Sequence, residues 1–238
     1  MAISAGSHQG TEAHATLVQG ILASAGLTAD SLQCPVAWPG NSDARKAASG
    51  EKREYFNCSG KHAGFLAASV AAGYSTDNYL KPEHPLQQQI LAVLEEFSGE
   101  KTFFTTADGC GAPLHTITVE GLARAIGKFT ATETEIVDAM LQNGWAVDDY
   151  GTADSLLLDA GYVAKLGAEG VFVIGTKEGY GVAVKIADGQ LRAAPLVAMG
   201  LLHKHGLMPT AVYEELFDKI SQKVTGGEKI TGRLEITK

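Results

Sequence analysis

The chain has 238 residues, of which 45% are hydrophobic and 19% charged, and its formal net charge is −8. This composition predicts a globular protein with a sizeable core, and the acidic balance argues against a nucleic-acid partner or an anionic membrane surface. No apolar stretch approaches the length of a membrane span, and the N-terminus lacks a signal-peptide pattern. Three cysteines are too sparse a set for a disulfide framework, so we expect a cytoplasmic protein.

The first half of the chain shows mainly helical patterns. Residues 1–10 are the exception, because "MAISAGSHQG" resembles a strand that runs into a turn. Apolar side chains recur at helical spacing in "TEAHATLVQGILASAG", and Gly26 suits the end of that helix. Residues 28–54 contain Pro and Gly at loop-like density. The predicted helices cover residues 11–26, 42–49, 60–72 and 83–97.

The second half combines helices with the strongest strand signals. The run "TFFTT" at 102–106 predicts a short strand. Two β-branched runs at 170–176 and 180–189 are separated by "KEG", which is typical of a hairpin. The other predicted elements are helices over 118–128, 132–143, 153–160, 194–205 and 209–222 and a strand over 229–237. Regular helical crossovers between strands are missing, so we expect one mixed α/β (α+β) domain over 1–238, with a largely antiparallel sheet covered by helices.

Residues 57–64, "NCSGKHAG", place five chemically active side chains directly before an apolar helix. Cys58 and Lys61 are three residues apart, so a helix that begins near Ser59 would present both on roughly one side. A lysine beside a thiol can activate the thiol as a nucleophile, and the same two groups can share a metal ion. In the third interpretation, Ser59 caps the helix and Cys58 fills the core. The motif alone leaves all three open.

The stretch "ADGCGAP" at 107–113 supplies a second thiol, Cys110, in a predicted tight turn. Asp108 and the two glycines favour a turn with exposed backbone N–H groups, which suit an anion or a carbonyl oxygen. Cys110, Cys58 and Lys61 together would form a tetrahedral metal site with one open position. The alternative is an ordinary turn between a strand and a helix.

The stretch "SAGSHQG" places Ser7 and His8 between a predicted strand and a predicted helix, where a nucleophile or a substrate-binding hydroxyl is often presented. Adjacent strand side chains point to opposite faces, so the two cannot contact each other as members of a triad. The alternative is a turn residue beside a surface residue. Lys185 lies inside the apolar run "VAVKIADG". Its amine either faces solvent or is partly buried and neutral, in which state it could act as a general base.

Several motifs together resemble one enzyme family. The combination of "NCSGKH" with a later "DGCGAP" is the most specific part of the match. The other stretches follow in the family's order: "ISAGSHQGTEAH", "LQCPVAWP", "YLKPEHPLQQ", "GLARA", "AKLGAEGVF" and "GVAVKIADG". Together they cover nearly the whole chain. The sequence is therefore similar to the L-asparaginase II family of thermolabile, Rhizobium-type asparaginases, which are also common in actinobacteria.

The resemblance implies a fold similar to serine β-lactamases and glutaminases, with an antiparallel sheet between helical layers. It also implies hydrolysis of L-asparagine to L-aspartate and ammonia by a serine/lysine site beside a zinc ion, and it is compatible with a homodimer. The implied zinc ligands are Cys58, Lys61 and Cys110, the implied serine–lysine pair is Ser7 with Lys185, and the residues expected to contact substrate are His8, Asp108, Gly151 and Thr152.

One part of the family pattern is not found in the sequence. The family carries two or three strands and an "R-S-x-x-K-P" helix start before the "SH" motif, and that segment supplies another serine–lysine pair. Serine and lysine three residues apart share a helical face, so a neutral amine can take the hydroxyl proton. The chain is therefore expected to be N-terminally truncated relative to the family. Three alternatives stay open: a non-catalytic member that binds zinc or an amino acid, a thiol amidohydrolase that uses Cys58, and a structural fragment.

Overall fold

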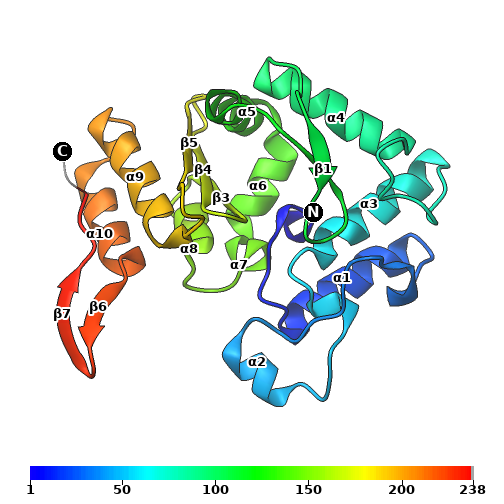
Figure 1. Ribbon diagram of the computed structural model, residues 1–238, viewed down its shortest axis with the longest axis horizontal. Coiled ribbons are helices and arrows are strands. Elements are labelled where there is room, and N and C mark those ends of the chain that lie inside the picture. The colour runs from blue at the N-terminus through cyan, green and yellow to red at the C-terminus, as the bar shows by residue number, and fades with distance from the viewer. Residues whose placement is uncertain (237–238) are drawn as a thin grey trace. The chain divides into compact units, whose positions relative to one another are not determined.

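Along the described residues, runs of helices are separated by groups of short antiparallel strands (Figure 1), which confirms the predicted mixed α/β class. The computed structural model describes residues 1–236. Contacts divide the chain into two units. Unit 1 comprises Met1–Ile117 and Asn143–Asp149, and unit 2 comprises Thr118–Gln142 and the chain from Tyr150 onward. In the described part of the chain, no helix is long and apolar enough to cross a membrane.

Two packed helices, α1 (Glu12–Ser24) and α3 (Ser59–Ala72), form the centre of unit 1. Val18 and Leu22 of α1 are four residues apart and fully buried, as the helical spacing predicts. The chain enters α1 through Thr11, whose hydroxyl accepts a hydrogen bond from the His14 N–H. The other elements are η1 (Ala2–Ala5), η2 (Ala29–Ser31), α2 (Ser42–Ala47), η3 (Arg53–Tyr55), α4 (Pro85–Ser98), β1 (Thr105–Ala107), β2 (Pro113–His115) and α7 (Gly144–Val147).

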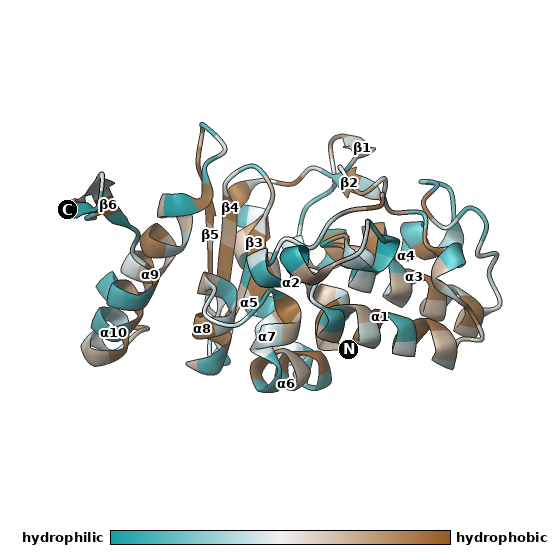
Figure 2. Cartoon of the chain, turned by 90° about the horizontal axis from the view of Figure 1, so that it is seen from below, coloured by the Kyte–Doolittle hydropathy of each residue, from teal (hydrophilic) through white to brown (hydrophobic). Residues whose placement is uncertain are grey.

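Unit 2 contains an antiparallel sheet with the strand order β3–β4–β5. These strands span Val163–Gly167, Val171–Gly175 and Gly181–Lys185. Strands β4 and β5 are mostly hydrophobic in Figure 2. Phe172 lies opposite Val184 across the ladder, and both belong to a buried cluster with apolar residues of α9 (Ala194–Lys204). This face of the sheet therefore supplies the core of unit 2.

The opposite face of the sheet packs closely on α5 (Val119–Thr132). Gly181 makes this approach possible, because a Cβ at this position would lie 1.9 Å from the Ala123 carbonyl oxygen. The predicted covering of the sheet by helices is thus present, with α5 and α9 on its two faces. The remaining elements of unit 2 are α6 (Thr134–Gln142), α8 (Ala153–Asp159), η4 (Leu191–Ala193), α10 (Thr210–Ile220), β6 (Lys223–Gly226) and β7 (Lys229–Arg233).

Two predicted strands need correction, and three strands were missed. Residues 1–10 do not form a strand, because Ala2–Ala5 form a 3₁₀ helix. The strand expected at 102–106 begins later, at Thr105, where pairing with β2 begins. Strands β2, β3 and β6 were not predicted. The sequence of β3, VAKLG, has few β-branched residues, and pairing with β4 determines its conformation. Strands β2 and β6 likewise depend on their pairing with β1 and β7. The last expected strand corresponds to β7, and its residue 237 lies outside the described residues.

Replacing Gly181 with alanine should destabilise unit 2 by about 2 kcal/mol, because the new methyl group overpacks the contact between β5 and α5. Gly20 is the control, since it lies in α1 with open space around it. Gly20→Ala should raise stability by about 0.5–1 kcal/mol through helix propensity. Urea unfolding measures both, and equal effects of the two variants would contradict the close packing of α5 on β5.

Candidate functional site

The motif "NCSGKHAG" forms the start of α3 in unit 1. Cys58 is the capping residue, and Ser59 is the first helical residue. The expectation that Ser59 caps the helix is therefore wrong. Its hydroxyl instead donates a hydrogen bond to the Glu54 carbonyl oxygen at 2.8 Å. Lys61 lies in the first turn, so Cys58 and Lys61 share one end of α3.

The motif "ADGCGAP" contains the turn between β1 and β2, as predicted. The Asp108 N–H donates to the Ala112 carbonyl oxygen at 2.8 Å, and the Gly111 N–H donates to the Asp108 carbonyl oxygen at 2.8 Å. Gly111 has a φ of 87°, which glycine adopts without a steric penalty. This turn carries Cys110, which is only 2% exposed.

The fold of unit 1 brings these two motifs together. The side-chain donor atoms of Cys58, Asp108 and Cys110 all lie within 4.8 Å of one another. Lys61 Nζ lies 3.7 Å from Asp108 Oδ2, and both side chains are 30% exposed. The Cys58–Asp108–Cys110 group could hold a metal ion. Asp108, which the resemblance assigned to substrate, is thus also a possible metal ligand.

Hydrogen bonds and burial make Cys110 a weak acid in the absence of a metal. A hydrogen bond with the Cys58 thiol and burial raise the pKa of Cys110 to about 12, with a further contribution from Asp108 in the same direction. His62 and Lys61 oppose this shift. A bound divalent cation reverses such a preference, because it binds the deprotonated sulfur directly.

Lys61 and Asp108 are held in their charged forms. Burial disfavours the Lys61 cation, but the Cys58 and Cys110 thiol groups and the Asp108 carboxylate outweigh burial and raise the pKa of Lys61. Burial also disfavours the Asp108 anion, but its hydrogen bond with Cys110 and the Lys61 charge outweigh burial and lower the pKa of Asp108. A lysine ligand must give up its proton, so metal binding through Lys61 would release protons.

Ser7 lies on a segment that runs beside the start of α3. The Ser7 N–H donates to the Val147 carbonyl oxygen at 2.8 Å, and the His8 N–H donates to the Asn57 carbonyl oxygen at 3.0 Å. Ser7 is half-buried, and no hydrogen bond to its hydroxyl is found among the described residues. The backbone therefore links the "SH" motif to the residue before Cys58 and leaves the Ser7 hydroxyl available.

His8 is buried and links the same two segments through its side chain. Its Nδ1 accepts a hydrogen bond from the Gly10 N–H at 3.1 Å, so its Nε2 carries the proton and donates to Ser59 Oγ at 2.9 Å. His8 is 1% exposed and has no ring nitrogen left for a substrate. The sequence pattern indicated no such role for Ser59. Its position next to Cys58 was the one available signal.

Lys185 ends strand β5 in unit 2 and is exposed. Its amine donates hydrogen bonds to the Glu169 carbonyl oxygen at 2.5 Å and to the Ile186 carbonyl oxygen at 2.8 Å. Of the two orientations considered from the sequence, the structure has the solvent-facing one.

Gly151 and Thr152 precede helix α8 in unit 2. The Thr152 hydroxyl accepts a hydrogen bond from the Ser155 N–H at 3.3 Å, and the Ser155 hydroxyl in turn accepts from the Thr152 N–H at 3.1 Å. This reciprocal pair is a capping box, which stabilises the helix start. Gly151 is exposed in a left-handed conformation, with a φ of 74°. Helix capping thus accounts for Thr152 independently of any ligand.

Comparison with known protein families identifies the chain. A family model described as L-asparaginase II matches residues 1–236. The chain belongs to the L-asparaginase II family. A comparison with curated protein sequences gives no significant match. Membership supports an asparaginase-type hydrolase at the level of the family, and the sequence resemblance is confirmed.

The residues of this asparaginase II chain fit a zinc ion by their chemistry. Zinc prefers four ligands drawn from thiolate, nitrogen and carboxylate groups. The two thiols and the Asp108 carboxylate come within the reach of one ion, and the Lys61 amine lies beside that carboxylate. Such a centre would draw its ligands from both motifs of unit 1.

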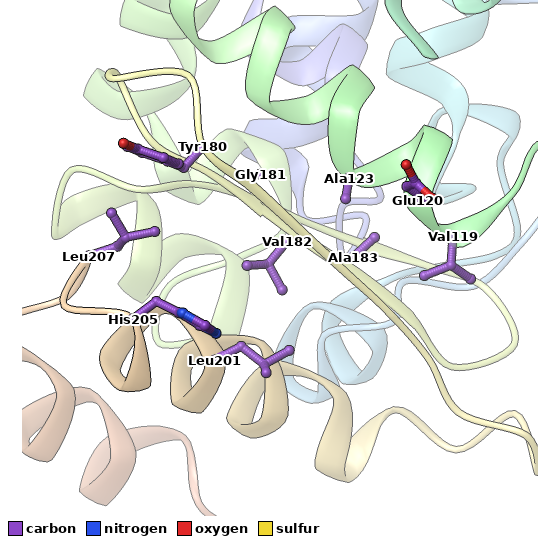
Figure 3. A pocket seen from close by; sticks show the side chains of 10 residues that line it. All are labelled: Val119, Glu120, Ala123, Tyr180, Gly181, Val182, Ala183, Leu201, His205 and Leu207. Atoms are coloured by element: carbon purple, nitrogen blue, oxygen red, sulfur yellow. The ribbon is translucent and has the colours of Figure 1, made fainter. Parts of the chain in front are cut away.

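A separate groove of about 610 Å³ lies in unit 2 of the asparaginase II chain, along strand β5. Figure 3 shows Val119 and Ala123 of α5 on one side of the strand and Leu201 of α9 on the other. Its lining is mostly apolar, with Glu120, Tyr180 and His205 as its ionisable groups. None of the described residues that line it is a predicted site residue.

If the group of Cys58, Asp108 and Cys110 holds a metal ion, the chain should bind one divalent ion such as zinc, and competition with a chromophoric chelator measures that binding. Cys110→Ser should weaken zinc binding at least about 100-fold, because it replaces a thiolate ligand with a poor donor. Cys34→Ala is the control, because Cys34 is a buried thiol outside the metal-binding group. The centre is contradicted if both variants bind zinc equally well.

Buried His8 predicts a loss of stability in acid. Burial lowers the pKa of His8 to about 3 from 6.5, and His14 adds to the shift. The contribution of His8 to the free energy of unfolding is therefore complete above pH 6.5 and is lost as the pH falls toward 3. Between pH 7 and pH 5, urea unfolding should show a loss of about 2 kcal/mol that is absent in His8→Asn. The exposed His205 serves as control, and a His205→Gln variant should keep the wild-type pH dependence.

Proposed function

We propose that this chain hydrolyses L-asparagine to L-aspartate and ammonia at a serine/lysine site beside a zinc centre. The observation that carries the proposal is the family match over residues 1–236, together with the cluster of Cys58, Asp108 and Cys110. In this proposal the chain is one cytoplasmic asparaginase II domain with a fold similar to serine β-lactamases. L-Asparagine is its small-molecule partner.

The proposed chemistry is acyl transfer. A serine hydroxyl attacks the side-chain amide carbon, a lysine amine carries the serine proton to the departing ammonia, and water then hydrolyses the aspartyl ester. Ser7 and Lys185 are proposed as a serine–lysine pair of this reaction. Backbone N–H groups of the turn that carries Cys110 are proposed to stabilise the oxyanion. The available hydroxyl of Ser7 supports its part in this assignment.

The polar groups near the substrate have separate proposed roles. A zinc ion held by Cys58, Lys61 and Cys110 would supply positive charge that orders the site. Asp108 is charged at neutral pH, because the effects of Cys110 and Lys61 hold its pKa low against burial. Its carboxylate is therefore suited to the α-ammonium group of an amino acid. Gly151 and Thr152 are proposed to contact the substrate from the loop before α8.

One observation favours a second candidate, a family member that binds zinc or an amino acid without turnover. The Lys185 amine is exposed and donates to two backbone carbonyl oxygens. A lysine that acts as a general base must instead be neutral and have its lone pair free. In this second candidate, Lys185 only ties the end of β5 to the residues before β4.

Turnover distinguishes the two candidates. The zinc-loaded chain should release ammonia from L-asparagine, and Ser7→Ala and Lys185→Met should each lower kcat at least about 100-fold, because each removes a group from proton transfer. Ser49 and Lys204 are exposed, so Ser49→Ala and Lys204→Met serve as matched controls that should keep wild-type kcat.

Two results would count against the catalytic assignment. Full turnover in both Ser7→Ala and Lys185→Met would overturn the roles of these residues while leaving the reaction intact. Calorimetric binding of L-asparagine without ammonia release by the wild-type chain would support the non-catalytic candidate.

A further inference from the structure

The segment that carries Ser7 runs beside α7 and the residue that follows it, all within unit 1. The Ser7 N–H donates to the Val147 carbonyl oxygen at 2.8 Å, and the Gln9 N–H donates to the Asp148 carbonyl oxygen at 3.0 Å. Gly6 lies so close to the same stretch that a Cβ at this position would be 2.9 Å from the Val147 carbonyl oxygen. Backbone contacts before, at and after Ser7 therefore hold this segment against the end of α7.

A side-chain hydrogen bond reinforces these backbone contacts. Gln9 Nε2 donates to Asp148 Oδ1 at 2.6 Å. Asp148 is only 3% exposed, so losing this donor would leave a buried carboxylate oxygen less well compensated. The bond joins residues that are far apart in the sequence, and it fixes the Gln9 side chain as well as the Gln9 backbone.

The loop before α2 encloses Gln9 from another side. The Asn41 N–H donates to the Gln9 carbonyl oxygen at 2.9 Å. A Cβ at Gly40 would lie 2.5 Å from Gln9 Oε1, so the loop backbone comes into close contact with the amide group. The Gln9 amide is therefore held between this loop and the Asp148 carboxylate.

The Ser7 hydroxyl depends on these neighbours for its orientation. Within residues 1–236, no hydrogen bond to this hydroxyl is found, and the side chain is half-buried. The next residue, His8, is fixed through Ser59, and Gln9 is fixed through Asp148. The direction of the hydroxyl thus follows from the backbone that these bonds hold in place.

We propose that Gln9 and Asp148 are positioning residues, whose side-chain hydrogen bond holds the Ser7 hydroxyl in its reactive orientation. The proposal rests on the catalytic role proposed for Ser7 and extends it to two residues that do not themselves react. A reacting group that is misplaced by about 1 Å can lose about 100-fold in rate, so a bond that fixes the backbone beside Ser7 affects the chemical step.

The experiment uses the full zinc-loaded chain and two measurements. One is ammonia release from L-asparagine, and the other is the rate at which a fluorophosphonate reagent labels Ser7, followed by mass spectrometry. Asp148→Leu removes the acceptor and should lower kcat and the labelling rate about 10- to 100-fold, with KM and zinc affinity unchanged. Gln9→Met removes the donor and should have the same effect. The double variant should be no slower than either single variant, because both changes remove the same bond.

A conservative variant and a matched control separate positioning from a general loss of stability. Asp148→Asn keeps an acceptor oxygen for Gln9 and should restore most of kcat and of the labelling rate. Asp149 is the neighbouring carboxylate, and it accepts a similar hydrogen bond from Asn41 Nδ2 at 2.7 Å. Asp149→Leu should therefore keep wild-type kcat and the wild-type labelling rate.

The outcomes distinguish this proposal from the proposed function. Wild-type kcat and labelling rate in Asp148→Leu would overturn the positioning role while the role of Ser7 stands. If Asp148→Leu does not fold, wild-type values in Gln9→Met would overturn it. If the wild-type chain releases no ammonia, the labelling rates decide in the same way. A wild-type chain that neither releases ammonia nor reacts at Ser7 would refute the catalytic role of Ser7 and this proposal with it.

Discussion

The hydrogen bond between His8 and Ser59 is the interaction on which the candidate site of unit 1 depends. It joins the segment that carries Ser7 to the first residue of α3, and the Ser59 hydroxyl continues to the Glu54 carbonyl oxygen. Both side chains are almost completely buried, so breaking either bond would leave an unsatisfied polar group inside the protein. The position of Cys58 relative to Ser7 is therefore set by buried polar contacts rather than by the helix alone.

The metal-binding group shows the cost of placing thiols and a carboxylate together. When no metal is bound, a hydrogen bond with Cys58, burial and the nearby Asp108 raise the pKa of the Cys110 thiol, so that it loses its proton with difficulty. Lys61 compensates part of this negative charge, because its amine lies close to Asp108. A divalent cation bound to this group would supply the balancing positive charge. It would also favour the deprotonated thiols, which could then act as ligands.

Unit 2 depends on a different constraint, the close packing of helices on both faces of a three-stranded sheet. One face uses large apolar side chains, such as Phe172 and Ile174, against α9. On the other face, the backbone of α5 packs directly against Gly181, which has no side chain to prevent this close contact. Lys185 ends the strand that both helices cover, so its backbone position is fixed even though its amine is exposed.

The sequence by itself determined the family, the helical segments and the two motifs of unit 1. Local patterns suffice for these features, because each one depends on residues that are close together in the sequence. Helical periodicity, turn residues such as Gly111 and dense groups of polar residues are all patterns of this kind. The tertiary structure decided which thiols and carboxylate meet, which hydroxyl bonds His8, and that β3 is a strand. It also decided that His62 and Tyr79 form a buried pair. These outcomes join residues far apart in the chain, and burial and hydrogen-bond geometry select them only after the chain has folded.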